Sequence, residues 1–318
     1  IISSTPQAVP ITEPVQKVVN KTETYSASTT VTAPSTQKSE SVSNFTSLTS
    51  EEKIKKSTVN ILCSMVRGNV IQKSTGSGVI INPQGIILTN AHVAEHILLE
   101  EAGRETCFVR TGSPARNSYK AKIIYLPDIW IQNNKNNLSI PNVTGTGEND
   151  YALLILTERV SVDADNIPVT YLSLTTSNPS EGQNIILAGY PANFGDVSLL
   201  DTALYQLQKT SNVNQVMSFD GSSIGAINTS PTVLAEHGSS GGAMVSTDGV
   251  LLGIMVATTI DKYSGQKNIQ GITIPYIRKS IEENSGKSFD FLLTNAQEES
   301  NNFQKEKVEY LSNILLGN

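Results

Sequence analysis

Residues 76–95 read GSGVIINPQGIILTNAHVAE and contain two short apolar segments separated by the sequence NPQG. The apolar segments are rich in Ile, Val and Leu, and the Asn, Pro and Gly between them are typical turn residues. The stretch therefore predicts two consecutive strands, the second of which leads directly to His92.

Strand-like segments of the same kind continue on both sides of this pair. Together with it they form a first set of six, the other four being residues 57–66, 106–112, 119–126 and 151–158. A second set of six covers residues 183–191, 202–210, 214–220, 226–233, 242–258 and 268–275. Six short strands without long helices between them favour a closed antiparallel barrel. We therefore expect an all-β protein with two six-stranded barrels, at about 57–160 and 180–275.

The two ends of the chain differ from this pattern. Residues 1–48 are dominated by Ser, Thr, Val, Pro, Lys and Glu, so we expect a disordered stalk or linker there, or a tail without function. The folded domain is expected at 49–285, beginning with a short helix capped by Thr49 and Glu52. The Asn-rich residues 127–149 are expected to be an inserted surface loop.

A helical extension is predicted at 286–318, after the helical sequence IPYIRKSIEE. Its last amphipathic stretch, about 302–316, places four apolar residues near one face, namely Phe303, Val308, Leu311 and Leu315. Core packing is the predicted use of that face, and binding of a partner is the alternative.

Composition excludes several classes of protein. The net charge of -6 comes from scattered acidic residues, and no basic stripe is present that could bind nucleic acid. No apolar run is long enough for a membrane-spanning helix, so no membrane insertion is expected. The two cysteines, Cys63 and Cys107, are too far apart in sequence for a CxxC motif and are either buried thiols or a structural disulfide.

A candidate nucleophile stands in GSSGG, where Ser240 lies between glycines in a G-x-S-x-G pattern. A nucleophilic serine needs a histidine base and an orienting carboxylate. The three histidines, His92, His96 and His237, all precede Ser240, and no Asp precedes Asp128. The residues of known catalytic triads follow one another in the sequence in a few different orders, and of these the order His, Asp, Ser fits this chain. Asp150 opens the apolar strand DYALLIL and is a better candidate than Asp128.

The chain resembles the trypsin-like peptidases, and especially the HtrA/Deg branch, in three segments that follow in the family's order. These are GSGVIINPQGIILTNAHVAE, DYALLIL and HGSSGGAMVSTDGVLLGIM. The resemblance covers about residues 59–281 and implies two Greek-key barrels and serine endopeptidase activity without a cofactor or metal. It implies that His92 is the general base, that Asp150 orients it and that Ser240 attacks the peptide carbonyl. The oxyanion hole falls at Gly238, Ser239 and Ser240, with the N–H groups of Gly238 and Ser240 as donors.

The same resemblance assigns a substrate pocket. Leu234 takes the place of the acidic residue by which trypsins select Arg or Lys, and the other expected lining residues are His237, Met255, Val256, Ala257, Thr258 and Gly271. Without a charge at its base, the pocket predicts small to medium aliphatic residues at P1, the residue before the cleaved bond. Protein or peptide substrates are the expected partners, and the sequence leaves the oligomeric state open.

The resemblance also concerns redox state and location. In a Greek-key barrel the first and fourth strands are neighbours, which brings Cys63 and Cys107 within reach of a disulfide. The family's usual export and the stalk predict a periplasmic, cell-envelope or extracellular protein. HtrA proteins usually carry a PDZ domain after the peptidase, and too few residues follow Ile281 for one.

Two alternatives remain open at the level of sequence. His92 to His96 spell H-x-x-E-H, a zinc pattern of metallopeptidases that requires a helix and a distant third ligand. A peptidase fold could also serve as a binding module with an idle triad.

Overall fold

The computed structural model describes residues 48–135, 147–192, 198–260 and 267–317, with the backbone alone at 257–260 and 267. All but the last residue of the predicted stalk lies outside this range. No helix among the described residues is long and apolar enough to cross a membrane.

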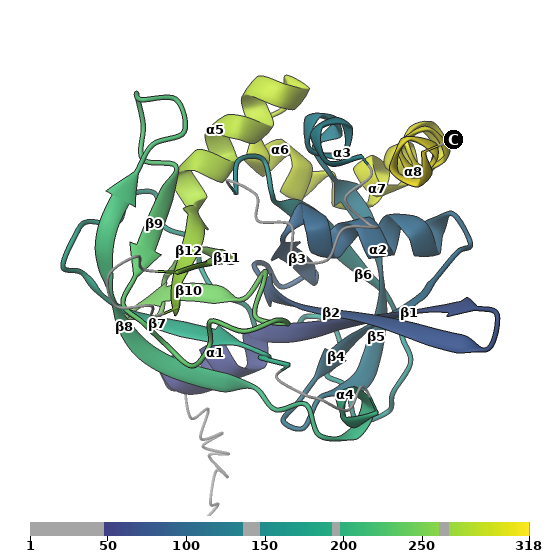
Figure 1. Cartoon of the computed structure of the whole chain (residues 1–318), viewed down its shortest axis with the longest axis horizontal. Coiled ribbons are helices and arrows are strands. Elements are labelled where there is room, and N and C mark those ends of the chain that lie inside the picture. Colours follow the sequence, from purple (N-terminus) through teal and green to yellow (C-terminus); the bar gives the residue numbers. More distant parts are fainter. Residues whose placement is uncertain (1–47, 136–146, 193–197, 261–266, 318) are drawn as a thin grey trace, which may run out of the picture. The chain divides into compact units, whose positions relative to one another are not determined.

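The first barrel contains six antiparallel strands that close in the order β1-β2-β3-β6-β5-β4 (Figure 1). The strands are β1 (Thr58–Arg67), β2 (Val70–Ile80), β3 (Ile86–Thr89), β4 (Thr106–Thr111), β5 (Arg116–Tyr125) and β6 (Ala152–Arg159). The pairing of β1 with β4 places Cys63 directly opposite Cys107, and a disulfide joins them across a Cα–Cα distance of 4.0 Å.

The second barrel closes in the order β10-β11-β12-β9-β8-β7. Its strands are β7 (Asn184–Gly189), β8 (Leu207–Met217), β9 (Ala226–Thr229), β10 (Ala243–Ser246), β11 (Leu251–Ile260) and β12 (Lys267–Thr273). The prediction of two six-stranded antiparallel barrels is thus confirmed.

Two predicted strand boundaries in the second barrel were wrong. The segments 202–210 and 214–220 were expected to be separate strands, but both contribute to the single long strand β8. The segment 242–258 was expected to be one strand, but a turn divides it into β10 and β11, with Ser246 N–H donating to the Val250 carbonyl at 2.9 Å.

Eight helices are found in the described part of the chain. They are α1 (Ser50–Ser57), α2 (Ala91–Glu101), α3 (Asp128–Asn134), α4 (Leu199–Thr202), α5 (Ile274–Ser285), α6 (Phe289–Thr294), α7 (Ala296–Glu306) and α8 (Val308–Leu316). In α1 both hydrogen bonds of the predicted capping box between Thr49 and Glu52 are present. The expected surface loop instead begins as α3, which buries Trp130 and Ile131, and residues 136–146 lie outside the described range.

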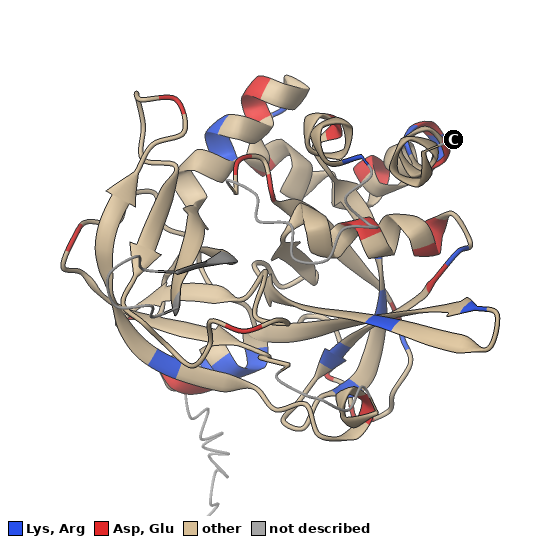
Figure 2. Ribbon diagram, in the orientation of Figure 1, with Lys and Arg blue, Asp and Glu red and all other residues tan. Residues whose placement is uncertain are grey.

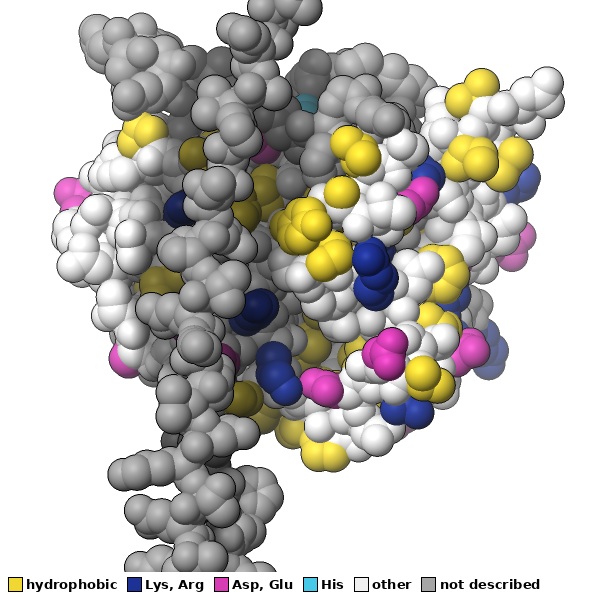
Figure 3. Space-filling view, turned by 90° about the horizontal axis from the view of Figure 1, so that it is seen from below, with side chains coloured by type: hydrophobic (Ala, Val, Ile, Leu, Met, Phe, Trp, Pro, Cys, Tyr) yellow, Lys and Arg dark blue, Asp and Glu magenta, His cyan; other side chains and the backbone are white. Residues whose placement is uncertain are grey.

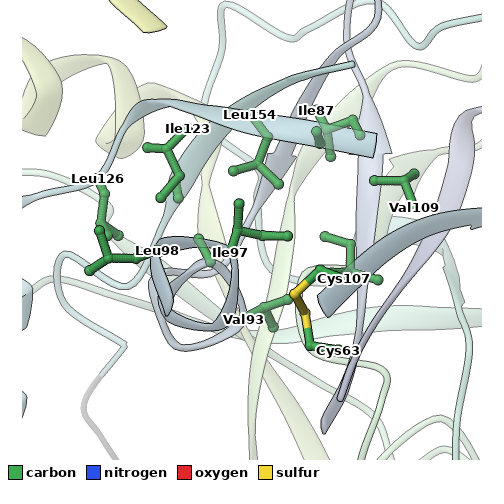
Figure 4. Packing of buried hydrophobic residues seen from close by; sticks show 14 of the residues in the cluster. Cys63, Ile87, Val93, Ile97, Leu98, Cys107, Val109, Ile123, Leu126 and Leu154 are labelled. Atoms are coloured by element: carbon green, nitrogen blue, oxygen red, sulfur yellow. A yellow bond between two sulfur atoms is a disulfide. The ribbon is translucent and has the colours of Figure 1, made fainter. Parts of the chain in front are cut away.

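The segment that carries His92 is helical, where the sequence predicted a strand. Val93, Ile97 and Leu98 on one face of α2 pack into the first barrel beside the disulfide (Figure 4). Val93 and Ile97, and likewise Ala94 and Leu98, are four residues apart, which matches the helical period, so burial of this face favours a helix here.

The helices at the C-terminal end complete the core of the first barrel. Phe303, Val308, Leu311 and Leu315 are all buried in the same cluster as the barrel residues. The core-packing prediction for this face is confirmed, and residues 286–317 form part of the same compact unit as the barrels.

Charged side chains are distributed over both barrels and the helices (Figure 2). On the face shown in Figure 3, acidic, basic and hydrophobic side chains are interspersed.

The packing of α8 predicts a large difference between two adjacent residues. Leu311→Ala should lower the free energy of unfolding by about 2–5 kcal/mol, because Leu311 is completely buried. Tyr310→Ala is the matched control, since Tyr310 is 51% exposed, and should change it by less than about 1 kcal/mol. Denaturant titration measures both values, and equal small effects would contradict the integral role of α8.

Candidate active site

His92 and Asp150 meet at the edge of the first barrel. His92 lies in the first turn of α2, and Asp150 lies just before β6. The Nδ1 atom of His92 is 2.7 Å from Oδ2 of Asp150, and the backbone N–H of His92 donates to Oδ1 at 3.0 Å. The carboxylate therefore binds both the ring and the backbone of the histidine, which fixes the ring so that Nε2 is its free nitrogen.

The pKa of His92 is raised above its ordinary value. Burial acts against the imidazolium and would lower the pKa, but the charge of Asp150 and its hydrogen bond outweigh burial, with a smaller contribution from Glu95. The side chain of Asp150 is 10% exposed, so little water weakens this interaction.

Asp150 is positioned by contacts to the residue before it. Asn149 has a positive φ of 58°, which is uncommon for a residue other than glycine. Helix α5 holds it there: Asn149 N–H donates to Tyr276 Oη at 3.1 Å, and Ser280 Oγ and Asn284 Nδ2 donate to its Oδ1 at 2.9 and 3.0 Å. Helix α5, which follows the last strand of the second barrel in the sequence, thus fixes the backbone just before Asp150.

Ser240 lies in a tight loop between β9 and β10, close to the first barrel. Gly238 has a φ of 86°, and a Cβ there would lie 2.5 Å from the Tyr190 carbonyl, so the loop requires glycine. Within the described residues, the N–H groups of Gly238 and Ser240 have no hydrogen-bond acceptor. Ser239 N–H donates to the Glu236 carbonyl at 3.3 Å, so it does not belong with these two free donors.

The hydroxyl of Ser240 is turned away from His92. Its Oγ donates to the Val256 carbonyl at 3.2 Å, and no hydrogen bond to His92 is present among the described residues. Both side chains nevertheless line the same cleft. Catalytic hydrogen bonds are often unformed in ligand-free structures, and rotation of a serine side chain is a small change.

Ser77 joins this loop to the first barrel. Its Oγ donates to the Gly238 carbonyl at 2.7 Å and accepts from Tyr190 N–H at 3.0 Å. Its backbone N–H donates to the Ser240 carbonyl at 2.7 Å. Ser77 is completely buried in β2. This one residue of the first barrel therefore fixes the position of the serine loop of the second barrel relative to the first.

The residues predicted to line a substrate pocket occupy different environments. Leu234 and Met255 are buried in the core of the second barrel, and a Cβ on Gly271 would collide with the sulfur of Met244 at 2.0 Å. Val256 is buried and presents its carbonyl to Ser240, while the side chains of Ala257 and Thr258 lie outside the described residues. His237 is exposed and lines the same cleft as His92.

The H-x-x-E-H pattern does lie on a helix, as a zinc site requires, but no third ligand joins its two histidines within the described residues. Nδ1 of His92 binds Asp150, and Nδ1 of His96 lies 3.0 Å from Glu105, contacts that orient a histidine with or without a metal. Among the described residues, the group with three ligand atoms close together is Cys63, Glu105 and Cys107, and its two sulfurs are joined in the disulfide. The geometry therefore favours the serine site over the metal site.

Ser77 and Asn149 were not identified as site residues from the sequence. Ser77 stands between two glycines in GSG, a context that allows close backbone approach and could have drawn attention to it. Asn149 gave no comparable signal, because its partners in α5 are more than 120 residues away.

Comparison with known proteins identifies the family of the chain. The family model described as trypsin-like peptidase domain matches residues 76–254. Among solved structures, the Rv3671c protease from M. tuberculosis in its active form is 17% identical, with 74% of this chain and 84% of that chain covered and a TM-score of 0.46. The inactive serine-to-alanine mutant of Rv3671c from M. tuberculosis H37Rv is 16% identical, with 75% and 91% covered and a TM-score of 0.47. No curated protein matches the sequence.

The contacts of Ser77 predict a loss of stability on removal of one hydroxyl. Ser77→Ala should lower the free energy of unfolding by about 1–3 kcal/mol, because it leaves the Gly238 carbonyl and the Tyr190 N–H buried without a partner. Ser74→Ala, in the same strand, removes a hydroxyl that makes no hydrogen bond among the described residues and is the control. Denaturant titration that gave the same value for both variants would refute the role of Ser77.

Proposed function

Since the chain belongs to the trypsin-like peptidase family and is a serine-type peptidase, we propose that it is an endopeptidase whose catalytic residues are His92, Asp150 and Ser240. The observation that carries the assignment is the 2.7 Å contact between His92 and Asp150, together with the cleft that His92 shares with the serine loop and its two free N–H groups.

Each group has a defined part in the proposed reaction. Nε2 of His92 takes the proton from Ser240 as its Oγ attacks the peptide carbonyl, and the N–H groups of Gly238 and Ser240 stabilise the oxyanion. His92 then gives the proton to the departing amine, and an acyl-enzyme remains. Water hydrolyses the acyl-enzyme by the same route, which restores the serine. Asp150 stays ionised throughout and stabilises the imidazolium.

Preference for a small or medium aliphatic residue at P1 is part of the proposal. The position that carries an acidic residue in trypsins is Leu234, which is buried among apolar side chains. A Lys or Arg at P1 would lose its hydration here without gaining an ion pair at Leu234. An aliphatic side chain at P1 carries no charge and therefore has no comparable hydration to lose.

An exported location is likewise proposed. The disulfide between Cys63 and Cys107 supports it, because structural disulfides persist in oxidising compartments such as the periplasm and the cell exterior. The idle binding module is the less favoured function, since the described site retains each group that the reaction needs.

Labelling by a fluorophosphonate tests the nucleophile directly. The reagent should modify Ser240, as located by peptide mass mapping, and Ser240→Ala should abolish both labelling and proteolysis. Ser239→Ala is the neighbouring control and should retain labelling. Proteolysis that survives Ser240→Ala and is lost with a chelator would establish the metal mechanism instead.

The pH dependence of kcat/KM reports on His92. Because the imidazolium cannot accept a proton and the pKa of His92 is raised above 6.5, activity should fall as the pH drops through a value above 6.5. Asp150→Asn should lower kcat by about 10⁴-fold, since it removes the orienting charge. A profile that is flat from pH 6 to 9 would contradict His92 as the base.

A peptide library tests the P1 preference. Cleavage after Val, Ala, Ile or Leu should exceed cleavage after Arg or Lys by about tenfold or more, which corresponds to one uncompensated polar burial. Dominant cleavage after basic residues would show that Leu234 does not lie at the base of the pocket.

A further inference from the structure

A cleft of about 420 Å³ lies beside the catalytic residues. Its described walls include β1, β2, α2, α4 and the serine loop, and Ile61, Cys63 and Val93 supply apolar lining. None of its described lining residues belongs to β11 or β12, the strands that carry most of the proposed P1 pocket. The proposed P1 pocket places the residue before the cleaved bond at β11 and β12, so this cleft is left for the residues after the bond.

Glu95 is the carboxylate of this cleft that has no direct partner. The other acidic and basic groups around it are paired: Lys73 with Asp201, His96 with Glu105, and His92 with Asp150. No hydrogen bond or ion pair engages Glu95 within the described residues. His237, which also lines the cleft, is exposed, and its side chain makes no hydrogen bond or ion pair within the described residues.

The surroundings of Glu95 disfavour the ionised form of its carboxyl group. Burial raises the pKa of Glu95 to about 7, although the nearby His96 and His92 act in the opposite direction. A carboxylate in this situation gains stability from a cation that enters the cleft, because the cation favours the ionised form. A protonated Lys or Arg side chain is the cation that a peptide supplies, and Arg can bind a carboxylate through two parallel hydrogen bonds.

The position of Glu95 indicates which substrate residue it meets. It lies three residues after His92 and therefore on the same side of α2, where side chains start about 5–6 Å apart. His92 stands at the bond to be cleaved, so the reach of Glu95 covers the first two residues on the leaving side.

We propose that Glu95 makes this cleft a binding subsite for Lys or Arg at P1′ or P2′, the first two residues after the cleaved bond. The subsite rests on the proposed peptidase function and adds a second determinant of specificity. Substrates would then be recognised by an aliphatic residue before the bond and a basic residue after it.

The experiment compares two peptides that share the same residues up to the cleaved bond. One carries Lys at P1′ and P2′, and the other carries Gln at both positions. Wild-type enzyme should show a kcat/KM ratio of about tenfold in favour of the Lys peptide, and Glu95→Gln should reduce the ratio to about one. Glu298→Gln, which changes an exposed carboxylate on α7, should keep the wild-type ratio.

The pH dependence of this ratio identifies the group responsible. Titration of His92 affects both peptides equally and cancels in the ratio. Ionisation of Glu95 should make the ratio rise as the pH increases through about 7, and the rise should disappear in Glu95→Gln. A rise that persists in this variant would assign the effect to another group facing the cleft, such as His96 or His237, and would overturn the proposal.

Other outcomes distinguish failure of the proposed Glu95 subsite from failure of the proposed peptidase function. Wild-type enzyme that cleaves both peptides at equal rates, at every pH from 6 to 8, would refute the subsite and leave the peptidase intact. Failure to cleave either peptide, together with no fluorophosphonate label on Ser240, would refute both. These comparisons use the wild-type protein, so they remain decisive even when a variant fails to fold.

Discussion

The hydrogen bonds of Ser77 are the constraint on which the geometry of the site depends. His92 and Asp150 belong to the first barrel, whereas Ser240 belongs to the second, so the reaction requires the two barrels to keep a fixed distance. Ser77 in β2 provides this by binding the backbone at Gly238, Tyr190 and Ser240 in the second barrel. The approach is so close that a Cβ on Gly241 would lie 2.1 Å from the Ser77 carbonyl. Glycine and serine at these positions therefore follow from packing between the barrels as well as from chemistry.

The remaining groups of the site are held by rigid elements on either side of that contact. Helix α2, which carries His92, is anchored in the barrel core by Val93, Ile97 and Leu98. Helix α5 holds Asn149, the residue before Asp150, in its positive-φ conformation. Polar groups fixed before substrate arrives need little reorganisation during the reaction. In the proposed mechanism the hydroxyl of Ser240 has to leave the Val256 carbonyl and turn toward His92. The same helix α2 carries Glu95, so the proposed catalytic base and the proposed subsite for a basic residue lie on one helix.

Much of this arrangement was accessible from the sequence. The alternating and apolar strands predicted both barrels. Three motifs in one chain order singled out His92 and Asp150, which are hydrogen-bonded, and Ser240, which lines the same cleft as His92. The predictions failed where a local pattern was ambiguous. ILTNAHVAEHILLE contains enough Ile, Leu and Val to suggest a strand, yet its apolar spacing also suits the helix α2 that the barrel core stabilises. The Asp248-Gly249 pair is a turn signal inside an otherwise apolar run, and it separates β10 from β11.

Contacts between distant segments were not accessible in this way. No local rule connects Asn149 with α5, or shows that Glu95 lacks a partner while its neighbours are paired. Such features depend on which side chains the completed fold brings together.

The most direct test of the central assignment is a crystal structure of the protein after reaction with a peptidyl phosphonate. Our account predicts a covalent bond from Ser240 Oγ to phosphorus. It also predicts that the phosphonyl oxygen accepts from the N–H groups of Gly238 and Ser240, and that Nε2 of His92 lies within hydrogen-bond distance of the adduct. An adduct on another residue, or an oxygen that points away from Gly238, would contradict it.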